Sequence, residues 1–339
     1  MMRITYFALL VLIMIGFSGC QATDGASDPA GAGAETASAP QELTRVRVPM
    51  GFVPDPQFAP VYVADEKGYF ADEGLEIEFD YSFETDGIAL VGANELPLAI
   101  VSGEQVILGR AQDLPLVYVM EWFQRFPIAV VSRAEAGIES PEHLEGKTVG
   151  VPGFFGASYV GYVGLLSSAG VEQENVTTEE IGFTQIEALL DDRVDAAVGY
   201  ANNEPVQLAQ QGVETNVIYV ADYIDLVANG VVTNERTMSE NPQLVRGFVH
   251  ALLRGLQDTL AAPDEAFEIS KGYVEGLDDN RRGVLDASLP LWEAETLGLT
   301  ASDSWSLTHD ILLQADQLDA PVEDLDAAYD NQFVLDFDP

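Results

Sequence analysis

Polar side chains that could bind the edge of a flat ligand follow a short apolar segment in the second half of the chain. Residues 195–199 have the composition of a buried strand, and Tyr200 continues it. Asn202, Asn203 and Glu204 then offer amide donors, amide acceptors and a carboxylate, which match the nitrogens and carbonyls of a heterocyclic ring. The alternative is a local role, because Asn202 or Asn203 could instead cap a following helix.

A second polar group stands where an apolar run at 96–101 gives way to a helical pattern at 104–111. Ser102 could cap this helix, with Gln105 three residues later as in a capping box. Alternatively, Ser102 and Glu104 contact a ligand, because the start of a helix also presents free N–H groups to a carbonyl or an anion. The sequence leaves both interpretations open.

Aromatic side chains gather in two segments. Trp122 and Phe123 lie in a stretch that polar residues interrupt, and Phe154, Phe155 and Tyr159 flank a glycine turn. Core packing is the usual role of such side chains, but flat rings also stack on flat heterocycles. We expect at least one of the two adjacent phenylalanines to cover a ligand.

Weaker candidates stand at the expected ends of strands. Phe52 follows the first strand and Gln57 opens the first helix, where turn formation is an equal alternative. Asp222, Tyr223 and Asn229 lie near the point at which we expect the chain to return to its first domain.

The composition argues against several classes of function. With 15 Lys and Arg against 56 Asp and Glu, the net charge is 15 − 56 = −41, so the chain lacks the basic surface that nucleic acids require. The acid excess suits either a cationic ligand or a strongly hydrated surface of the kind that works in high salt. The sequence also lacks a Gly-x-Ser-x-Gly motif, a phosphate-binding loop and a His-rich metal pattern. We therefore expect no catalytic residues, no metal and no cofactor.

The N-terminus has the pattern of a secretory signal. Residues 6–17 form an apolar run that is shorter than the roughly 20 residues of a membrane-spanning helix. The run ends in Ser18, Gly19 and Cys20, which resembles a bacterial lipoprotein signal. The resemblance implies that residues 1–19 are a signal peptide and that Cys20 is lipidated. A buried free thiol is the alternative for Cys20. Residues 21–41 lack large apolar side chains, which predicts a flexible tether over residues 20–44.

Strand-like and helical patterns alternate over the rest of the chain, which predicts an α/β protein. The expected strands are 45–50, 75–81, 96–101, 114–120, 128–131, 148–151, 195–199, 216–220 and 231–233. The expected helices are 59–72, 88–93, 104–111, 158–168, 184–192 and 242–262. We expect one lobe from residues 45–127 and 231–339, a second lobe from residues 128–230, and a ligand cleft between them.

Three segments, residues 54–75, 146–153 and 194–205, carry a family resemblance. Together they resemble the solute-binding proteins of bacterial ABC importers in the nitrate, sulfonate and thiamine-pyrimidine group. The resemblance implies a type II periplasmic binding fold whose two lobes close on a small molecule. It also implies a location outside the cytoplasm, with a membrane permease and its ATPase as partners.

Within this group, the ligand depends on a few positions. Pyrimidine-precursor binders typically carry Asp-Trp and a histidine near the first helix, where this chain has Gly51-Phe52 and Gln57-Phe58. Ser102–Gln105 and residues 120–127 look closer to riboflavin-binding members. We therefore expect riboflavin first, a formyl-aminopyrimidine second, and a sulfonate or nitrate third. A ligand-sensing lipoprotein is the alternative from a different class. The yeast pyrimidine synthases of similar fold use histidine and cysteine clusters that this chain lacks.

The lipid anchor can be tested by replacing Cys20 with alanine. Because the apolar run is too short to span a bilayer, Cys20→Ala should move the protein from the membrane fraction to the soluble fraction without changing ligand binding. Fractionation of cells that express each form measures this. A variant that stays with the membrane would show that another segment holds it there.

Overall fold

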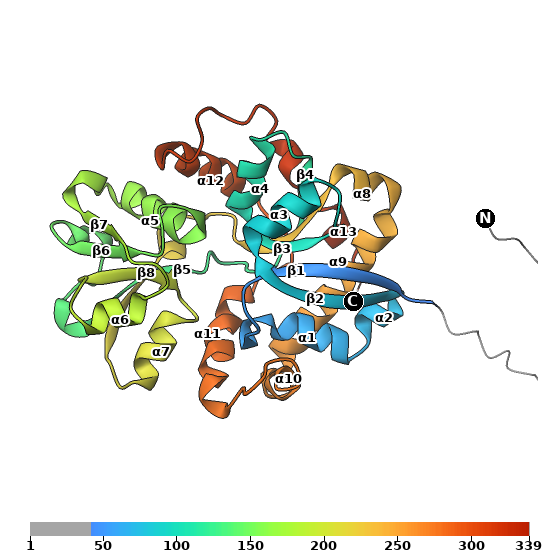
Figure 1. Ribbon diagram of the computed structural model, residues 1–339, viewed down its shortest axis with the longest axis horizontal. Helices are drawn as coiled ribbons and strands as arrows, with labels where there is room; N and C mark the ends of the chain where they lie inside the picture. Colours follow the sequence, from blue (N-terminus) through green and yellow to red (C-terminus); the bar gives the residue numbers. More distant parts are fainter. Residues whose placement is uncertain (1–41, 339) are drawn as a thin grey trace, which may run out of the picture. The chain divides into compact units, whose positions relative to one another are not determined.

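Three β-sheets form the frame of residues 42–338, the part of the chain that this computed structural model describes (Figure 1). Strands β1 (Thr44–Gly51) and β2 (Leu75–Phe83) form a parallel pair. Strand β10 (Asn229–Asn234) lies between β3 (Ala99–Ser102) and β4 (Leu116–Glu121) and is antiparallel to both. The predicted signal peptide, the predicted lipidation site Cys20 and most of the predicted tether lie outside the described residues.

The third sheet has five strands, in the order β7, β6, β8, β5 and β9. Their bounds are Thr177–Glu180 for β7, Thr148–Val151 for β6, Ala196–Tyr200 for β8, Ile128–Arg133 for β5 and Thr215–Tyr219 for β9. Strand β6 is parallel to both of its neighbours, whereas β5 is antiparallel to both of its own. The molecule is thus an α/β protein with two lobes, as predicted.

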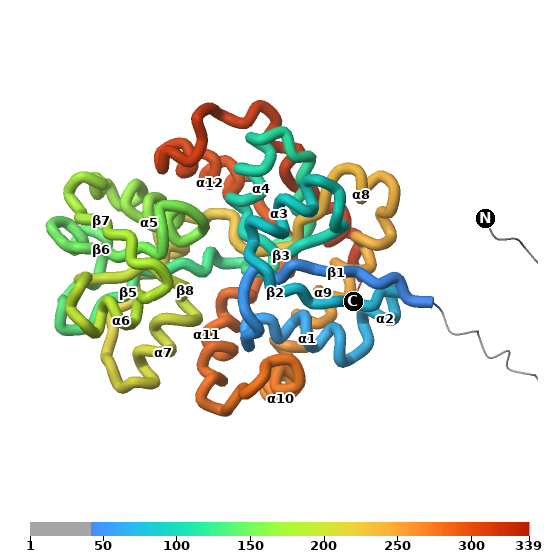
Figure 2. The backbone as a smooth tube through the Cα atoms, in the orientation of Figure 1, coloured from blue at the N-terminus to red at the C-terminus, as the bar shows by residue number. Residues whose placement is uncertain are grey.

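The chain passes between the two lobes along neighbouring segments, one after β4 and one before β10. Figure 2 shows them as teal and gold stretches of the tube. The backbone N–H groups of Trp122 and Phe123 both donate to the carbonyl oxygen of Asn229 at 3.0 Å. These hydrogen bonds hold the two segments side by side. The exact residues at which each lobe begins and ends stay a prediction.

Helices flank the sheets. Their bounds are α1 (Ala59–Glu66), α2 (Tyr69–Asp72), α3 (Glu84–Gly92), α4 (Gly103–Arg110), α5 (Gly156–Ala169), α6 (Gln185–Leu190), α7 (Glu204–Gln210), α8 (Glu235–Glu240), α9 (Pro242–Ala261), α10 (Pro263–Ser270), α11 (Arg282–Trp292), α12 (Ser302–Gln314) and α13 (Gln332–Leu335). Two short 3-10 helices, η1 (Pro56–Phe58) and η6 (Asp279–Arg281), matter for the site. No helix within residues 42–338 is both long enough and apolar enough to cross a membrane.

The structure corrects three of the predicted elements. The single helix expected over 59–72 is two helices, because Gly68 has a φ of +76° and breaks the helical backbone. Strand β7 was missed because its Thr-Thr-Glu-Glu sequence has no apolar residue. The strand expected at 96–101 begins only at Ala99, after Pro97.

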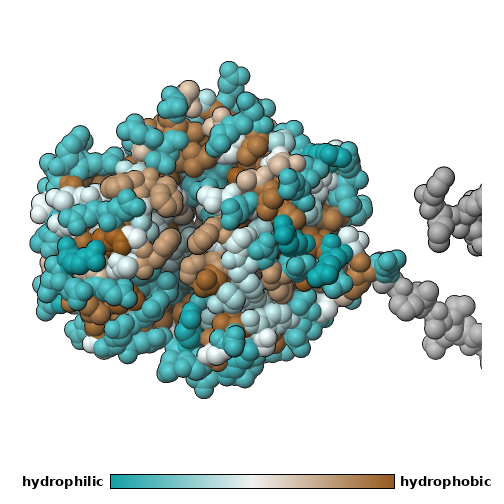
Figure 3. Space-filling view, viewed as in Figure 1, coloured by the Kyte–Doolittle hydropathy of each residue, from teal (hydrophilic) through white to brown (hydrophobic). Residues whose placement is uncertain are grey.

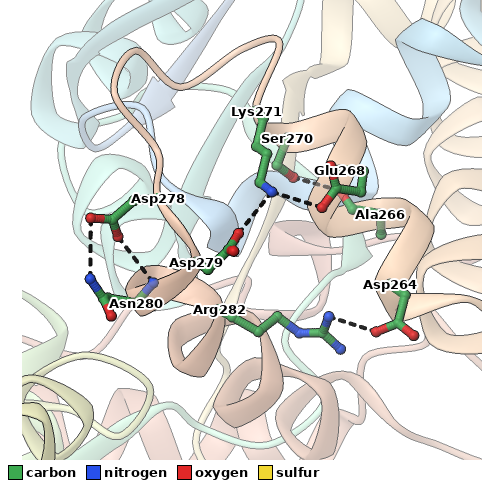
Figure 4. A network of polar contacts seen from close by, with 9 residues as sticks. All are labelled: Asp264, Ala266, Glu268, Ser270, Lys271, Asp278, Asp279, Asn280 and Arg282. Carbon is green, nitrogen blue, oxygen red and sulfur yellow. Dashed lines mark hydrogen bonds and ion pairs between the residues drawn. The ribbon is translucent and has the colours of Figure 1, made fainter.

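A polar network fixes the turn between α10 and α11 (Figure 4). Lys271 donates from its Nζ to Glu268 at 2.7 Å and to Asp279 at 2.8 Å. Asp278 caps η6 by accepting from the N–H of Asn280 at 3.0 Å, and Arg282 at the start of α11 reaches back to Asp264. Each exposed pair contributes little alone, about 0–1 kcal/mol. Together they fix the approach to α11, which packs against η1 and α7.

The close packing of α9 on α1 gives a direct test of the fold. A Cβ atom on Gly255 would lie 2.1 Å from the carbonyl oxygen of Pro60 and 2.8 Å from the Cβ of Ala64. Gly255→Ala should therefore lower the free energy of unfolding by about 1–3 kcal/mol, measured by urea denaturation. The control is Gly272→Ala at an exposed position, where the new Cβ would meet only the Ile269 oxygen at 3.3 Å. Equal stability of the two variants would contradict this packing.

Candidate functional site

Exposed apolar side chains stand at the carboxyl ends of parallel strands in both lobes. Their exposed fractions run from 40% to 75%, although their size would normally favour burial. They are Phe52 and Val53 after β1, Phe83 at the end of β2, Phe154 and Phe155 after β6, and Phe183 after β7. We call these six residues the apolar rims.

The rims lie where α/β proteins bind their ligands. Gly51 pairs with Phe83 in the β1–β2 register, so Phe52 and Phe83 end neighbouring strands of one lobe. Strands β6 and β7 are parallel neighbours in the other lobe, so Phe154 and Phe183 follow neighbouring ends there. The carboxyl edge of parallel strands is the usual ligand side. In Figure 3, brown apolar atoms lie on both sides of a recess near the centre of the surface.

The predicted aromatic residues have different environments. Phe154 makes an edge-on contact with Tyr159, with ring centres 5.4 Å apart, and Phe155 is largely exposed. Trp122 is only 1% exposed and stacks on Trp292 with a 6.0 Å separation. Its indole Nε1 has no hydrogen-bond partner among the described residues. Trp122 therefore packs in the core, and its predicted contact with a ligand stays a prediction.

Ser102 does not cap helix α4, which corrects one of the two interpretations of this residue. It occupies the N-cap position, but its side chain makes no capping hydrogen bond. Its hydroxyl instead lies 2.5 Å from Oε2 of Glu84 and 2.6 Å from Oε1 of Glu104. The amide of Asn229 donates to Oε1 of Glu84 at 3.0 Å. We call Glu84, Ser102, Glu104 and Asn229 the polar floor.

Tyr200 connects the polar floor to the five-stranded sheet. Burial and the nearby carboxylates of Glu84 and Glu104 raise the pKa of its phenol, which also lies beside Asn229. Glu84, Ser102, Glu104 and Asn229 belong to α3, β3, α4 and β10, whereas Tyr200 ends β8. The floor therefore lies where the two lobes meet. Sequence analysis missed Glu84, for which a helix start was the only local signal.

Glu204 begins α7 directly after the Tyr200 segment. Its Oε2 accepts from the N–H of Tyr200 at 2.7 Å, and its Oε1 accepts from the amide of Asn203 at 3.1 Å. Gly199 leaves room for this carboxyl, because a Cβ there would lie 2.2 Å from Oε2. Burial raises the pKa of Glu204 to about 7. Neither Asn202 nor Asn203 caps α7 through its side chain, and Asn202 donates instead to Ser288 of α11 at 2.8 Å.

The start of η1 is held by a contact with η6. Asp55 is 3% exposed, accepts from the N–H of Gln57 at 3.0 Å and pairs with Arg281 of η6. Burial raises the pKa of Asp55, while Gln57 and Arg281 oppose this shift. The hydrogen bond from its N–H to Asp55 holds half-buried Gln57 at the start of the first helical segment. Of the weaker candidates, Asp222 pairs with Arg125 and Tyr223 is exposed.

A further buried carboxyl joins the two crossing segments. Oε1 of Glu121, at the end of β4, accepts from the N–H of Ala228 at 2.9 Å. Glu121 is 7% exposed, and burial raises its pKa to about 8. The hydrogen bond connects the end of β4 to the segment before β10.

Comparison with known proteins places this architecture in a family. A family model described as NMT1/THI5 like matches residues 55–266. The chain belongs to this NMT1/THI5-like family. The matched span runs from η1 to the start of α10 and includes the polar floor, Glu204 and the rims of the second lobe.

Two relatives with similar sequences are named as binding proteins. The riboflavin-binding protein RibY of Chloroflexus aurantiacus is 42% identical, and the match covers 98% of this chain and 99% of the relative. A formylaminopyrimidine-binding protein of Halalkalibacterium halodurans is 33% identical over 69% of this chain and 72% of the relative.

Among solved structures, the periplasmic aliphatic sulphonate binding protein SsuA of Escherichia coli superposes with a TM-score of 0.71. The match covers 85% of this chain and 98% of that one at 12% sequence identity. At this identity the likeness shows the fold alone. The chain thus has the two-lobed fold of periplasmic binding proteins, as predicted.

The buried carboxyl of Glu121 makes the stability of this NMT1/THI5-like protein depend on pH. Its pKa is about 8 in the folded protein and 4.5 in a free side chain, so the folded state binds the extra proton between these values. The stability that this proton provides is complete below pH 4.5 and is lost as the pH rises through 8. Glu121→Gln keeps an acceptor for Ala228 and removes the titration. The stability of the variant relative to wild type should therefore rise between pH 5 and 8, by at most about 1.4 kcal/mol per pH unit.

Thermal melts across this pH range measure the effect, with exposed Glu174→Gln as the control. A difference between Glu121→Gln and wild type that does not change with pH would contradict the assignment.

Proposed function

We propose that this protein is the extracytoplasmic substrate-binding subunit of an ABC importer and that it captures a planar vitamin-type heterocycle, riboflavin first. A membrane permease and its ATPase are the proposed partners, and lipidated Cys20 is the proposed anchor. The observation that carries the proposal is the pairing of exposed phenylalanine rims from both lobes with a buried polar floor.

The rims favour a wide, flat ligand. Exposing several phenylalanines to water is unfavourable, and stacking on a ring system removes this cost. Phe52 and Phe83 would cover one face of the ring, and Phe154 and Phe155 the other. A three-ring flavin fills such a slot better than a single pyrimidine. The likeness to the riboflavin-binding relative over nearly the whole chain supports the same choice.

The floor disfavours an anionic ligand. The hydrogen-bond partners of Glu84, Glu104 and Glu204 within the described residues are hydroxyl, amide and backbone N–H groups. A sulfonate or nitrate carries a negative charge that these acidic groups repel. This repulsion applies even though the fold is shared with sulfonate binders. A neutral heterocycle with N–H groups instead finds acceptors.

A formyl-aminopyrimidine is the second candidate. It too offers N–H donors to the carboxyls, and the relative from Halalkalibacterium halodurans supports it. A protein that senses the ligand would bind it in the same way as a protein that imports it. Uptake by a permease that requires this protein would indicate import rather than sensing.

Titration calorimetry with riboflavin, formyl-aminopyrimidine, taurine and nitrate tests the ligand. We expect riboflavin to bind most tightly. Phe155→Ala should weaken riboflavin binding by about 1–3 kcal/mol, or roughly 5- to 150-fold, by analogy with base stacking on aromatic side chains. The control is Leu335→Ala, which truncates an equally exposed apolar side chain of α13. Binding of taurine or nitrate without binding of either heterocycle would refute the proposed ligand.

A further inference from the structure

The two carboxyls of the polar floor share one hydroxyl. The Ser102 oxygen lies 2.5 Å from Oε2 of Glu84 and 2.6 Å from Oε1 of Glu104, which are both distances of strong O–H···O hydrogen bonds. A serine hydroxyl has one proton and donates one such bond. The second short contact therefore needs a proton on a carboxyl, which then donates to the serine oxygen. The pair holds one proton and one negative charge.

The donors around each carboxyl locate the charge. Glu84 accepts from the N–H of Ser102 at 3.2 Å and from the amide of Asn229 at 3.0 Å, in addition to the Ser102 hydroxyl. Besides Ser102, Glu104 has a weak 3.3 Å contact from Gln105 and a contact with its own backbone N–H. Three donors stabilise a carboxylate on Glu84, so the proton resides on Glu104. Burial raises the pKa of both groups, which agrees with one proton held by the pair.

Glu84 is held in place beside the apolar rim of its lobe. Gly51, at a φ of +79°, leaves the space that it needs, because a Cβ there would lie 2.8 Å from the Cγ of Glu84. Glu84 is half-buried, directly after the rim residue Phe83. A carboxylate has about four lone-pair positions and Glu84 uses three, so it can accept one more hydrogen bond.

Two neighbouring groups have unused hydrogen-bonding capacity. Oδ1 of Asn229 and Oε2 of Glu104 have no partner within the described residues, although these residues are only 7% and 1% exposed. Buried polar atoms without partners are rare in folded proteins, so each of these two atoms has room for a partner that the described residues do not supply. Both atoms belong to residues that support Glu84 directly or through Ser102.

We propose that Glu84 selects the ligand by accepting a hydrogen bond from a ring N–H of a neutral planar heterocycle, with Ser102 and proton-bearing Glu104 as its positioning residues. This inference rests on the proposed function and adds the group that recognises the ligand's edge. In a flavin, the ring N–H of the pyrimidine portion lies between two carbonyls. Tyr200, on the other lobe beside Glu84, offers an O–H donor of the kind that such carbonyls require.

A matched pair of ligands isolates this hydrogen bond. Riboflavin has the ring N–H, and 3-methylriboflavin carries a methyl group in its place while keeping the same stacking surface. Wild-type protein should bind riboflavin at least about tenfold more tightly, because a charge-assisted hydrogen bond is lost and a methyl group meets a carboxylate. Glu84→Ala removes the acceptor and opens space, so the preference should fall below about threefold. Glu95→Ala, an exposed position just after the same helix, should keep it.

The outcomes separate this inference from the proposed function. Wild-type protein that binds neither flavin overturns both. Wild-type protein that binds both flavins equally, or a Glu84→Ala variant that keeps the tenfold preference, overturns the role of Glu84 and leaves riboflavin binding standing. If Glu84→Ala does not fold, Glu84→Gln keeps the shape and loses the charge. It should then weaken riboflavin binding about three- to tenfold and leave 3-methylriboflavin unchanged, and unchanged affinity for both would overturn the inference.

Discussion

Buried carboxyl groups at the junction of the two lobes are the constraint on which the site depends. Burying an ionised carboxylate costs several kcal/mol unless donors and neighbouring dipoles compensate. The chain compensates three of these carboxyl groups by the same means. Glu84, Glu104 and Glu204 each lie in the first turn of a helix, where the free N–H groups favour negative charge. Burial also raises the pKa of Glu121 to about 8, which favours proton uptake by this carboxyl.

The same arrangement explains how one fold can serve different ligands. The helices α3, α4 and α7 begin near the ends of strands. In this protein the first turn of each of these helices carries a glutamate. Combined with apolar rims on both lobes, the floor suits a ligand that is flat, uncharged and rich in N–H groups.

Sequence patterns predicted those parts of the structure that depend on local burial. Strand β6 and helix α9 match their predicted ranges almost residue for residue, because their apolar spacing is regular. The break at Gly68 depends on one backbone angle, and β7 has no apolar residue to reveal it. The polar floor depends on contacts between distant residues, since Asn229 and Glu84 are 145 positions apart. No local pattern could indicate that Ser102 would bridge two carboxyls instead of capping its helix.

The most direct test of the account is a crystal structure of the protein with riboflavin bound. The account predicts the ring system between the Phe52 and Phe83 side and the Phe154 and Phe155 side, with the pyrimidine edge of the flavin within hydrogen-bond distance of Glu84. A flavin bound elsewhere, or bound in the cleft with its sugar chain toward Glu84 and its ring N–H in solvent, would contradict it.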